Sequence, residues 1–276
     1  MNIIETMEEL RSARSGLLEP VGFVPTMGFF HQGHLSLVRQ ARQDCASVVV
    51  SIYINPTQFG AQEDLQNYPR NLQRDLELLR SEGVDLVWTP NDEVMYPQGF
   101  QTWVMVEEVT KPLEGSIRAG HFRGVATVVT KLFTAVQPDK AYFGQKDAQQ
   151  AVVIRRMTRD LDFPIEIIVC PTVREPDGLA MSSRNVYLNP EERRAAVMLS
   201  RALFKANASF EAGEREASHL RGVMLEILAA EPMISVQYVS CAHPVTLQEL
   251  EGRVDQALLS LAVTIGKTRL IDNVII

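Results

Sequence analysis

Cysteine is scarce in this sequence of 276 residues, and the three that occur, Cys45, Cys170 and Cys241, lie far apart. No Cys-x-x-Cys pair is present, so neither a disulfide framework nor a zinc ribbon is indicated. Each cysteine adjoins an apolar or strand-like run, and we expect a buried free thiol at each position.

Long apolar runs and an excess of basic residues are also missing. No run approaches the ~20 residues of a membrane helix, and no basic segment followed by an apolar one opens the chain. We therefore expect no signal peptide, no membrane partner and a cytoplasmic location. The net charge of −7 argues against nucleic acid as a partner, because nucleic-acid-binding proteins usually carry a basic stripe. A local cluster of Lys, Arg and His can still form a positive pocket for a phosphate ligand.

Strand-like and helix-like segments alternate over the first part of the chain. Strands are predicted at residues 21–25, 48–54, 86–89, 140–143 and 165–169, with a further outlying strand at 103–106. Helices are predicted at residues 34–45, 71–81, 125–136 and 147–161. This alternation predicts an α/β fold, a Rossmann-like parallel sheet domain with helices on both faces. In such sheets, ligands bind beyond the carboxyl ends of the strands.

The pattern changes after about residue 174. Residues 174–184 are polar and contain Pro176 and Gly178, which is typical of a loop or hinge. Helices are predicted at residues 190–212 and 215–230, with Asn189 and Pro190 as the cap and first turn. Strands follow at 235–241, 257–265 and 269–275. We expect a larger domain over 1–174 and a smaller α+β C-terminal domain over 175–276 that closes over the site as a lid.

Two histidines follow the first predicted strand, in the run Pro25-Thr26-Met27-Gly28-Phe29-Phe30-His31-Gln32-Gly33-His34. The spacing of His31 and His34 lets both face one way on the first turn of a helix, near its positive end. Gly28 and Gly33 allow the backbone to approach a ligand closely. A triphosphate fits this arrangement. A metal site or a pair of structural histidines are the alternatives, although no third metal ligand lies nearby in the sequence.

Two further segments combine a glycine or hydroxyl groups with a cation. Gly144-Gln145-Lys146-Asp147 follows a predicted strand and opens a helix, so Lys146 can neutralise phosphate and Asp147 can accept from ribose hydroxyls. The alternative is a helix cap at Asp147 and a surface charge at Lys146. Met181-Ser182-Ser183-Arg184 lies in the hinge and suits an anion clamp, or else an ordinary turn. The histidine segment resembles the HIGH motif of the nucleotidyltransferase superfamily, and the segment in the hinge resembles the KMSKS loop of that superfamily, with Arg in place of Lys.

A longer resemblance, to the pantothenate synthetase family, covers nearly the whole chain. It is carried by VPTMGFFHQGHLSL, SIYINPTQF, DLQNYPR, LEGSIRAGHFRG, KLFTAVQPDKAYFGQKDAQQAVVI, GLAMSSRNVYL and TRLIDN. The combination of Asn-Pro-x-Gln-Phe with Gly-His-Phe-Arg-Gly is specific to that family. The resemblance implies ATP-dependent condensation of pantoate with β-alanine through a pantoyl-adenylate, with Mg²⁺ and release of AMP and pyrophosphate. It also implies a homodimer through the larger domain.

The resemblance assigns residues to each substrate. The catalytic residues are His31, His34, Lys146 and Arg184. Those placed around ATP are Met27, Gly28, His31, Gly33, His34, Gly144, Gln145, Lys146, Asp147, Val173, Met181, Ser182, Ser183 and Arg184. Those placed around pantoate and β-alanine are Gln58, Gln150, Pro25, Thr26, Asn55, Tyr68 and Arg118. The acidic cluster expected on the metal side is thin, with Asp75 as its main member, so no residue is assigned to Mg²⁺, which phosphates and water can hold.

Other functions remain as alternatives at this stage. The nearest is a nucleotidyltransferase that keeps the adenylyl group on its product, and a tRNA synthetase fragment is disfavoured by the acidic charge. A nucleotide-sensing protein without catalysis is another, although intact His31, His34, Lys146 and Arg184 argue against it. A Rossmann dehydrogenase is disfavoured because no Gly-x-Gly-x-x-Gly follows the first strand.

Overall fold

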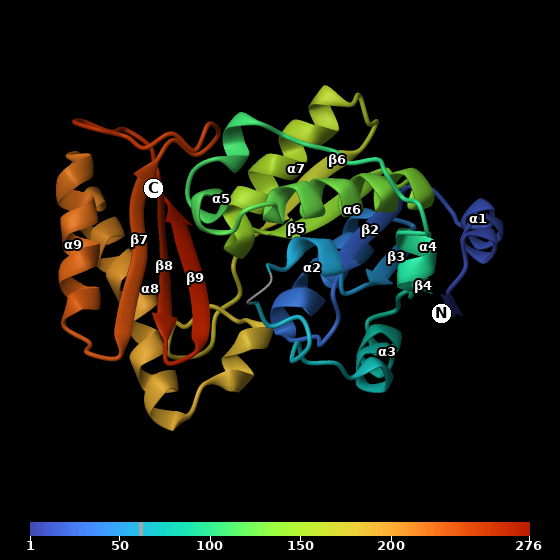
Figure 1. Cartoon of the computed structure of the whole chain (residues 1–276), viewed down its shortest axis with the longest axis horizontal. Helices are drawn as coiled ribbons and strands as arrows, with labels where there is room; N and C mark the ends of the chain where they lie inside the picture. Colours follow the sequence, from blue (N-terminus) through green and yellow to red (C-terminus); the bar gives the residue numbers. More distant parts are fainter. Residues whose placement is uncertain (61–62) are drawn as a thin grey trace.

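The computed structural model describes residues 1–60 and 63–276. Within them, a six-stranded parallel sheet has the order β1-β4-β3-β2-β5-β6, and a separate three-stranded antiparallel sheet has the order β7-β8-β9. Figure 1 shows the smaller sheet with α8 and α9 on one side of the molecule, and the larger sheet with its helices on the other. The predicted fold class is confirmed.

The larger sheet and its surroundings come from the first part of the chain. Its strands are β1 (Asn2–Ile4), β2 (Val21–Thr26), β3 (Ser47–Ile52), β4 (Leu86–Trp88), β5 (Lys140–Gly144) and β6 (Glu166–Cys170). Its helices are α1 (Met7–Ser15), α2 (Gln32–Asp44), α3 (Leu72–Ser81), α4 (Asp92–Met95), α5 (Glu114–Ile117), α6 (His121–Val136) and α7 (Ala148–Asp160). Short 3-10 helices are η1 (Pro56–Gln58), η2 (Glu108–Thr110) and η3 (Gln145–Asp147).

The C-terminal part begins with η4 (Ser183–Tyr187) and contains α8 (Pro190–Glu211), α9 (Ala217–Ala229), β7 (Ile234–Ala242), β8 (Leu258–Ile265) and β9 (Thr268–Ile275). Asn189 caps α8 as predicted: its side chain accepts from the backbone of Glu191 and Glu192, and Pro190 occupies the first turn. Among the described residues, no helix has both the length and the apolar character needed to span a bilayer.

Separate apolar cores hold the layers together. One lies between the larger sheet and α1, α6 and α7, and another lies on the opposite face against α2 and α3. The apolar stripe predicted for α6 is buried along its whole length, and Val48, Val49 and Val50 of β3 are fully buried, as the run of β-branched residues indicated. A further core fills the space between α8, α9 and the smaller sheet. The three cysteines are free and buried, as expected.

The strand predicted at residues 103–106 is wrong. The segment is irregular and is held by side chains: the Val104 amide donates to Thr127 Oγ1 at 3.0 Å, and the Arg123 guanidinium lies over the Trp103 ring. Contacts with α6 therefore replace a strand ladder. His31 also differs from expectation, because it caps α2 rather than lying in its first turn.

Candidate active site

A cavity of about 230 Å³ opens where the carboxyl ends of β2, β5 and β6 meet the loop after β3. Its lining contains these predicted site residues: Pro25, Thr26, Met27, His31, Gly33, His34, Asn55, Gln58, Tyr68, Arg118, Gly144, Lys146, Asp147, Gln150, Val173, Met181, Ser182, Ser183 and Arg184. Gly28 and Gln145 lie outside the lining found for the described residues. Segments separated by up to about 160 residues in sequence thus converge on one site at the edge where a parallel sheet places its ligands.

The two histidines are packed against each other at the start of α2. Their ring centroids lie 4.0 Å apart. His31 Nδ1 accepts from the Gly33 amide at 3.1 Å, and His34 Nδ1 accepts from the His31 amide at 3.4 Å. Gly33 is required here, because a Cβ at this position would lie 2.9 Å from the His31 ring.

Both imidazoles are neutral near pH 7. Burial, together with the nearby Lys146 ammonium, lowers the pKa of His31 to about 4. Burial also lowers the pKa of His34 well below its ordinary value, with contributions from His31 and Lys146. Since each Nδ1 already accepts a backbone hydrogen bond, the proton of each neutral ring resides on Nε2. The pair can therefore offset phosphate charge by donating hydrogen bonds, not by carrying a positive charge.

Asp75 supports the loop before His31 and does not face the cavity. It is buried at the start of α3, where Oδ2 accepts from the Phe29 amide at 2.6 Å and Oδ1 accepts from the Phe30 amide at 2.8 Å. Gly28 lies against it with a φ of +82°, and a Cβ there would lie 3.0 Å from Asp75 Oδ2. Asp75 therefore shapes the Gly28–Phe30 turn, and both of its oxygens are already occupied.

The described residues offer no protein cage for a metal ion. Within residues 1–60 and 63–276, His, Cys, Asp and Glu side chains form no group of three that could hold one. With Asp75 bonded to backbone amides, the acidic residue expected on the metal side is also excluded. Among these residues, no third side chain of that kind joins His31 and His34 in such a group.

The turn after β5 brings Lys146 into the cavity wall. Its side chain is only 20% exposed, and its Nζ lies 4.0 Å from Asp147 Oδ1. Asp147 is the N-cap residue of α7, yet its side chain makes no cap hydrogen bond within the described structure. The alternative of a surface lysine and a plain helix cap is therefore wrong. Gln145 points elsewhere, and its Nε2 donates to Asn273 Oδ1 at 2.9 Å.

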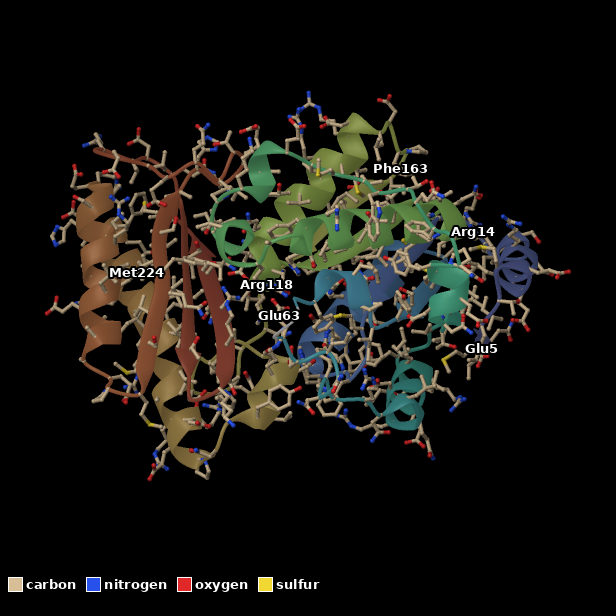
Figure 2. All side chains as sticks on the ribbon, viewed as in Figure 1. Glu5, Arg14, Glu63, Arg118, Phe163 and Met224 are labelled. Atoms are coloured by element: carbon tan, nitrogen blue, oxygen red, sulfur yellow. The ribbon has the colours of Figure 1, made fainter. Side chains whose placement is uncertain are left out.

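Two arginines of the cavity are each paired with a carboxylate from one segment. Arg118 binds Glu63 through Nε at 2.7 Å and Nη2 at 2.6 Å. Arg184 binds Asp64 through Nε at 3.0 Å and Nη2 at 2.8 Å. Figure 2 shows Glu63 and Arg118 adjacent to each other on the side of the larger sheet that faces β9. The contact with Asp64 uses Nε and Nη2 of Arg184, and Nη1 takes no part in it.

The part of the cavity lined by Asn55 and Gln58 depends on a close approach between η1 and α6. Asn55 is buried, and its Nδ2 donates to Gln58 Oε1 at 3.0 Å and to the Gly124 carbonyl at 3.2 Å. A Cβ at Gly124 would lie 2.3 Å from the Thr57 carbonyl oxygen, so only glycine permits this contact. The two segments that carried the family resemblance, Asn-Pro-x-Gln-Phe and Gly-His-Phe-Arg-Gly, therefore pack directly on each other.

His121 lines the cavity and was missed as a site residue, although it stands in the Gly-His-Phe-Arg-Gly segment. Its Nδ1 lies 2.8 Å from the Gln58 carbonyl oxygen and its Nε2 lies 3.0 Å from Arg118 Nη1. A carbonyl only accepts and a guanidinium only donates, so Nδ1 carries the proton and the ring is neutral. Burial, aided by the Arg118 charge, lowers the pKa of His121 to about 4, consistent with this tautomer.

Known proteins resemble this chain in sequence and in fold. The Pantoate-beta-alanine ligase family model matches residues 2–275. The pantothenate synthetase of Roseiflexus sp. (strain RS-1) is 59% identical over 276 residues, which covers 100% of this chain and 99% of that protein. The crystal structure of pantothenate synthetase from Thermus thermophilus has a TM-score of 0.95 at 49% identity and covers 99% of both chains.

A further solved structure was determined with ligands. It is a pantoate-beta-alanine ligase from Francisella tularensis complexed with beta-gamma ATP and beta-alanine, with a TM-score of 0.81 at 34% identity. It covers 99% of this chain and 97% of that protein. From the full-length family match and these identities, the chain belongs to the pantoate-beta-alanine ligase family.

Proposed function

We propose that this protein joins pantoate to β-alanine in two steps, using ATP. In the first step, a carboxylate oxygen of pantoate attacks the α-phosphorus of ATP, and pyrophosphate leaves. In the second step, the amine nitrogen of β-alanine attacks the acyl carbon of the pantoyl-adenylate. AMP leaves with the electrons of the broken bond, and the nitrogen loses a proton.

The first step must bring a carboxylate to a triphosphate of the same sign. Lys146 supplies a positive charge in the cavity wall, and Arg184 supplies Nη1 in addition to the nitrogens bound to Asp64. His31 and His34 supply Nε2 hydrogen-bond donors. Donors fixed in advance stabilise the transition state because they need not reorganise as charge develops. The proposed pantoate ligands, Gln58 and Gln150, orient the nucleophile without neutralising it.

The observation that carries the proposal is the convergence of Lys146, the histidine pair and Arg184 on the cavity that also contains Gln58 and Gln150. The test is pantoate-dependent exchange of labelled pyrophosphate into ATP. We expect Lys146→Ala and His34→Ala to slow this exchange by orders of magnitude, because each removes a group that the transition state requires. Near-normal exchange in both variants would refute the assignment.

The amine step separates this proposal from a nucleotidyltransferase that retains the adenylyl group. Both enzymes would catalyse acid-dependent exchange. Only the ligase releases AMP when β-alanine is added to enzyme, ATP and pantoate, and releases little without it. Formation of a stable adenylylated product, with no AMP after the amine is added, would support the alternative. ATP binding without turnover would support a nucleotide sensor.

Mg²⁺ enters this proposal with the nucleotide. Because Asp75 is bound to backbone amides and the described residues contain no ligand cluster, we assign no protein ligand to the ion. Phosphate oxygens and water satisfy the octahedral preference of Mg²⁺. We expect the Mg²⁺ concentration needed for activity to rise with the ATP concentration. Calorimetry should detect no Mg²⁺ binding to the enzyme alone.

The domain division and the assembly are part of the same proposal. We place the boundary at residue 174, since separate apolar cores lie on either side of it. ATP with pantoate is expected to protect the segment 174–185 from proteolysis, because the smaller domain closes over the adenylate and excludes water. A homodimer is proposed from the family resemblance, and light scattering in solution tests it. A cytoplasmic location is proposed separately.

A further inference from the structure

Asn273, on β9 of the smaller sheet, contacts the turn that carries Lys146. Its Nδ2 donates to the Gln145 carbonyl at 3.0 Å and to the Lys146 carbonyl at 2.8 Å. Its Oδ1 accepts from Gln145 Nε2 at 2.9 Å. Carbonyl oxygens only accept, so the amino group of Asn273 must face the turn. We propose that Asn273 is a positioning residue that fixes Lys146 for adenylate formation, an inference that rests on the function proposed above.

The turn has little else to hold it in place. None of the three residues of η3, Gln145–Asp147, is buried, and no side chain caps it within the described structure. A second, smaller cavity of about 40 Å³ lies beside it, lined in part by Lys146, Asp147 and Asn273. Apolar packing therefore does not set the position of the turn on this side. The Asn273 amide contributes to it through its hydrogen bonds to the carbonyls of Gln145 and Lys146.

Asn273 is itself held rigidly. It is only 4% exposed and pairs with Ser260 in the register of β8 and β9. The carboxylate of Asp272 accepts from the Asn273 amide at 2.8 Å. The same carboxylate binds Arg174 through Nη1 at 2.6 Å and Nη2 at 3.0 Å. A buried carboxylate with this many hydrogen bonds has little freedom to move. Asp272 therefore holds the backbone of Asn273 in place.

This arrangement connects the two parts of the chain through the nucleotide turn. Arg174 lies at the start of the polar segment that joins them, and Asn273 lies on the sheet that follows. If the smaller domain swings away, the carbonyls of Gln145 and Lys146 lose their donor. Closure of the smaller domain and correct placement of the Lys146 ammonium are therefore one event. In this proposal, the smaller domain positions the catalytic lysine as well as closing over the site.

The substitution Asn273→Asp tests this inference. The side chain keeps its shape, but an oxygen replaces the nitrogen that faces the two carbonyls, so the turn is repelled. We expect the kcat of pantoate-dependent exchange to fall about 30- to 100-fold, as for a displacement of ~1 Å in a catalytic group. The KM for ATP should change much less, since the charge of Lys146 acts mainly in the transition state. Hydrogen–deuterium exchange at the amides of residues 145–148 should become faster.

Leu270→Ala is the matched control. Leu270 lies on the same strand and is buried in the core of the smaller domain, a cluster that contains none of residues 145–147. This variant should melt at a lower temperature yet keep kcat within about twofold of the wild type. Should Asn273→Asp fail to fold, Asn273→Ser replaces it. Its hydroxyl retains one donor, and an intermediate loss of kcat is expected.

The outcomes separate this inference from the proposed function. An Asn273→Asp enzyme with the kcat of the Leu270→Ala control would overturn the inference, as would unchanged amide exchange at residues 145–148. A wild-type protein without pantoate-dependent pyrophosphate exchange would overturn the proposed function instead. In that case the amide-exchange comparison still decides whether Asn273 holds the turn.

Discussion

Gly124→Ala is predicted to damage the pantoate side of the site, against the expectation from helix propensity. Gly124 lies inside α6, where replacing glycine with alanine stabilises an exposed helix by about 1 kcal/mol. Here the new Cβ would lie 2.3 Å from the Thr57 carbonyl oxygen and 2.8 Å from the Gln58 amide nitrogen. These are backbone atoms, so no side-chain rotation relieves the contact. The η1 segment must move by roughly 1 Å, and overpacking of this kind costs about 1–3 kcal/mol.

The contact is with backbone atoms, so we expect the steric cost to outweigh the propensity gain and the free energy of unfolding to fall by a net amount of up to about 2 kcal/mol. Asn55 and Gln58 are joined by a 3.0 Å hydrogen bond and pack against α6. The same displacement moves both side chains away from that helix. We expect kcat/KM for pantoate to fall on the order of 100-fold, while ATP affinity changes little. Urea denaturation measures the stability, and pyrophosphate exchange with varied pantoate measures the activity.

The control is the same substitution in α9. Gly222 is exposed on that helix, and nothing lies within 4 Å of the Cβ that alanine would add. Gly222→Ala should therefore stabilise the protein by about 0.5–1 kcal/mol and leave the exchange kinetics unchanged. A Gly124→Ala protein as stable as the wild type, with the same dependence on pantoate, would show that η1 does not rely on its contact with α6.

Three further predictions concern the polar groups of the cavity. Gln58→Ala should raise the KM for pantoate by about 10- to 100-fold and leave the KM for ATP nearly unchanged, since it removes an orienting amide and no charge; steady-state exchange with each substrate varied distinguishes the two. Arg184→Lys should slow exchange by about tenfold or more, because a single ammonium lacks the planar fork that binds Asp64 through Nε and Nη2 and holds Nη1 apart from that contact; an unaltered rate would exclude the clamp role. The pKa of His31, about 4, lies below its ordinary value, so its contribution to stability is complete above about pH 6.5 and is lost as the pH falls toward 4. His31→Asn should therefore flatten the decline in unfolding free energy over that range, measured by urea titration at several pH values.

The order of strands and helices was predictable because each segment carries its own periodicity. The apolar stripe of α6 and the apolar run of β3 can each be recognised within one short contiguous segment of the sequence. The segment 103–106 shows the limit of this reasoning. Its composition suits a strand, yet the Thr127 hydroxyl and the Arg123 guanidinium hold it against a helix. The three-residue strand β1 and the short helix α4 were not predicted, since neither is long enough to display a period.

The site was predictable to the extent that its chemistry lies in contiguous motifs. His31 with His34, and Gly144 with Lys146, can be recognised from glycine and charge at a junction between a strand and a helix. The partners that orient these groups cannot. Asp64 lies 120 residues from Arg184, and Asn273 lies 127 residues from Lys146. Such pairs exist only once the chain has folded, so no local pattern identifies them.

Asp75 illustrates why a residue type in the right neighbourhood is weak evidence for its role. The family resemblance places Asp75 in the acidic cluster expected on the metal side, although no residue was assigned to Mg²⁺. The structure places the carboxylate beneath the loop, where it accepts from the amides of Phe29 and Phe30. Burial raises the pKa of this carboxyl, and the hydrogen bonds from the Phe30 and Phe29 amides oppose that shift. Those hydrogen bonds support the turn that leads into His31. The backbone geometry around a charged group therefore decides whether that group meets the substrate or holds the residues that do.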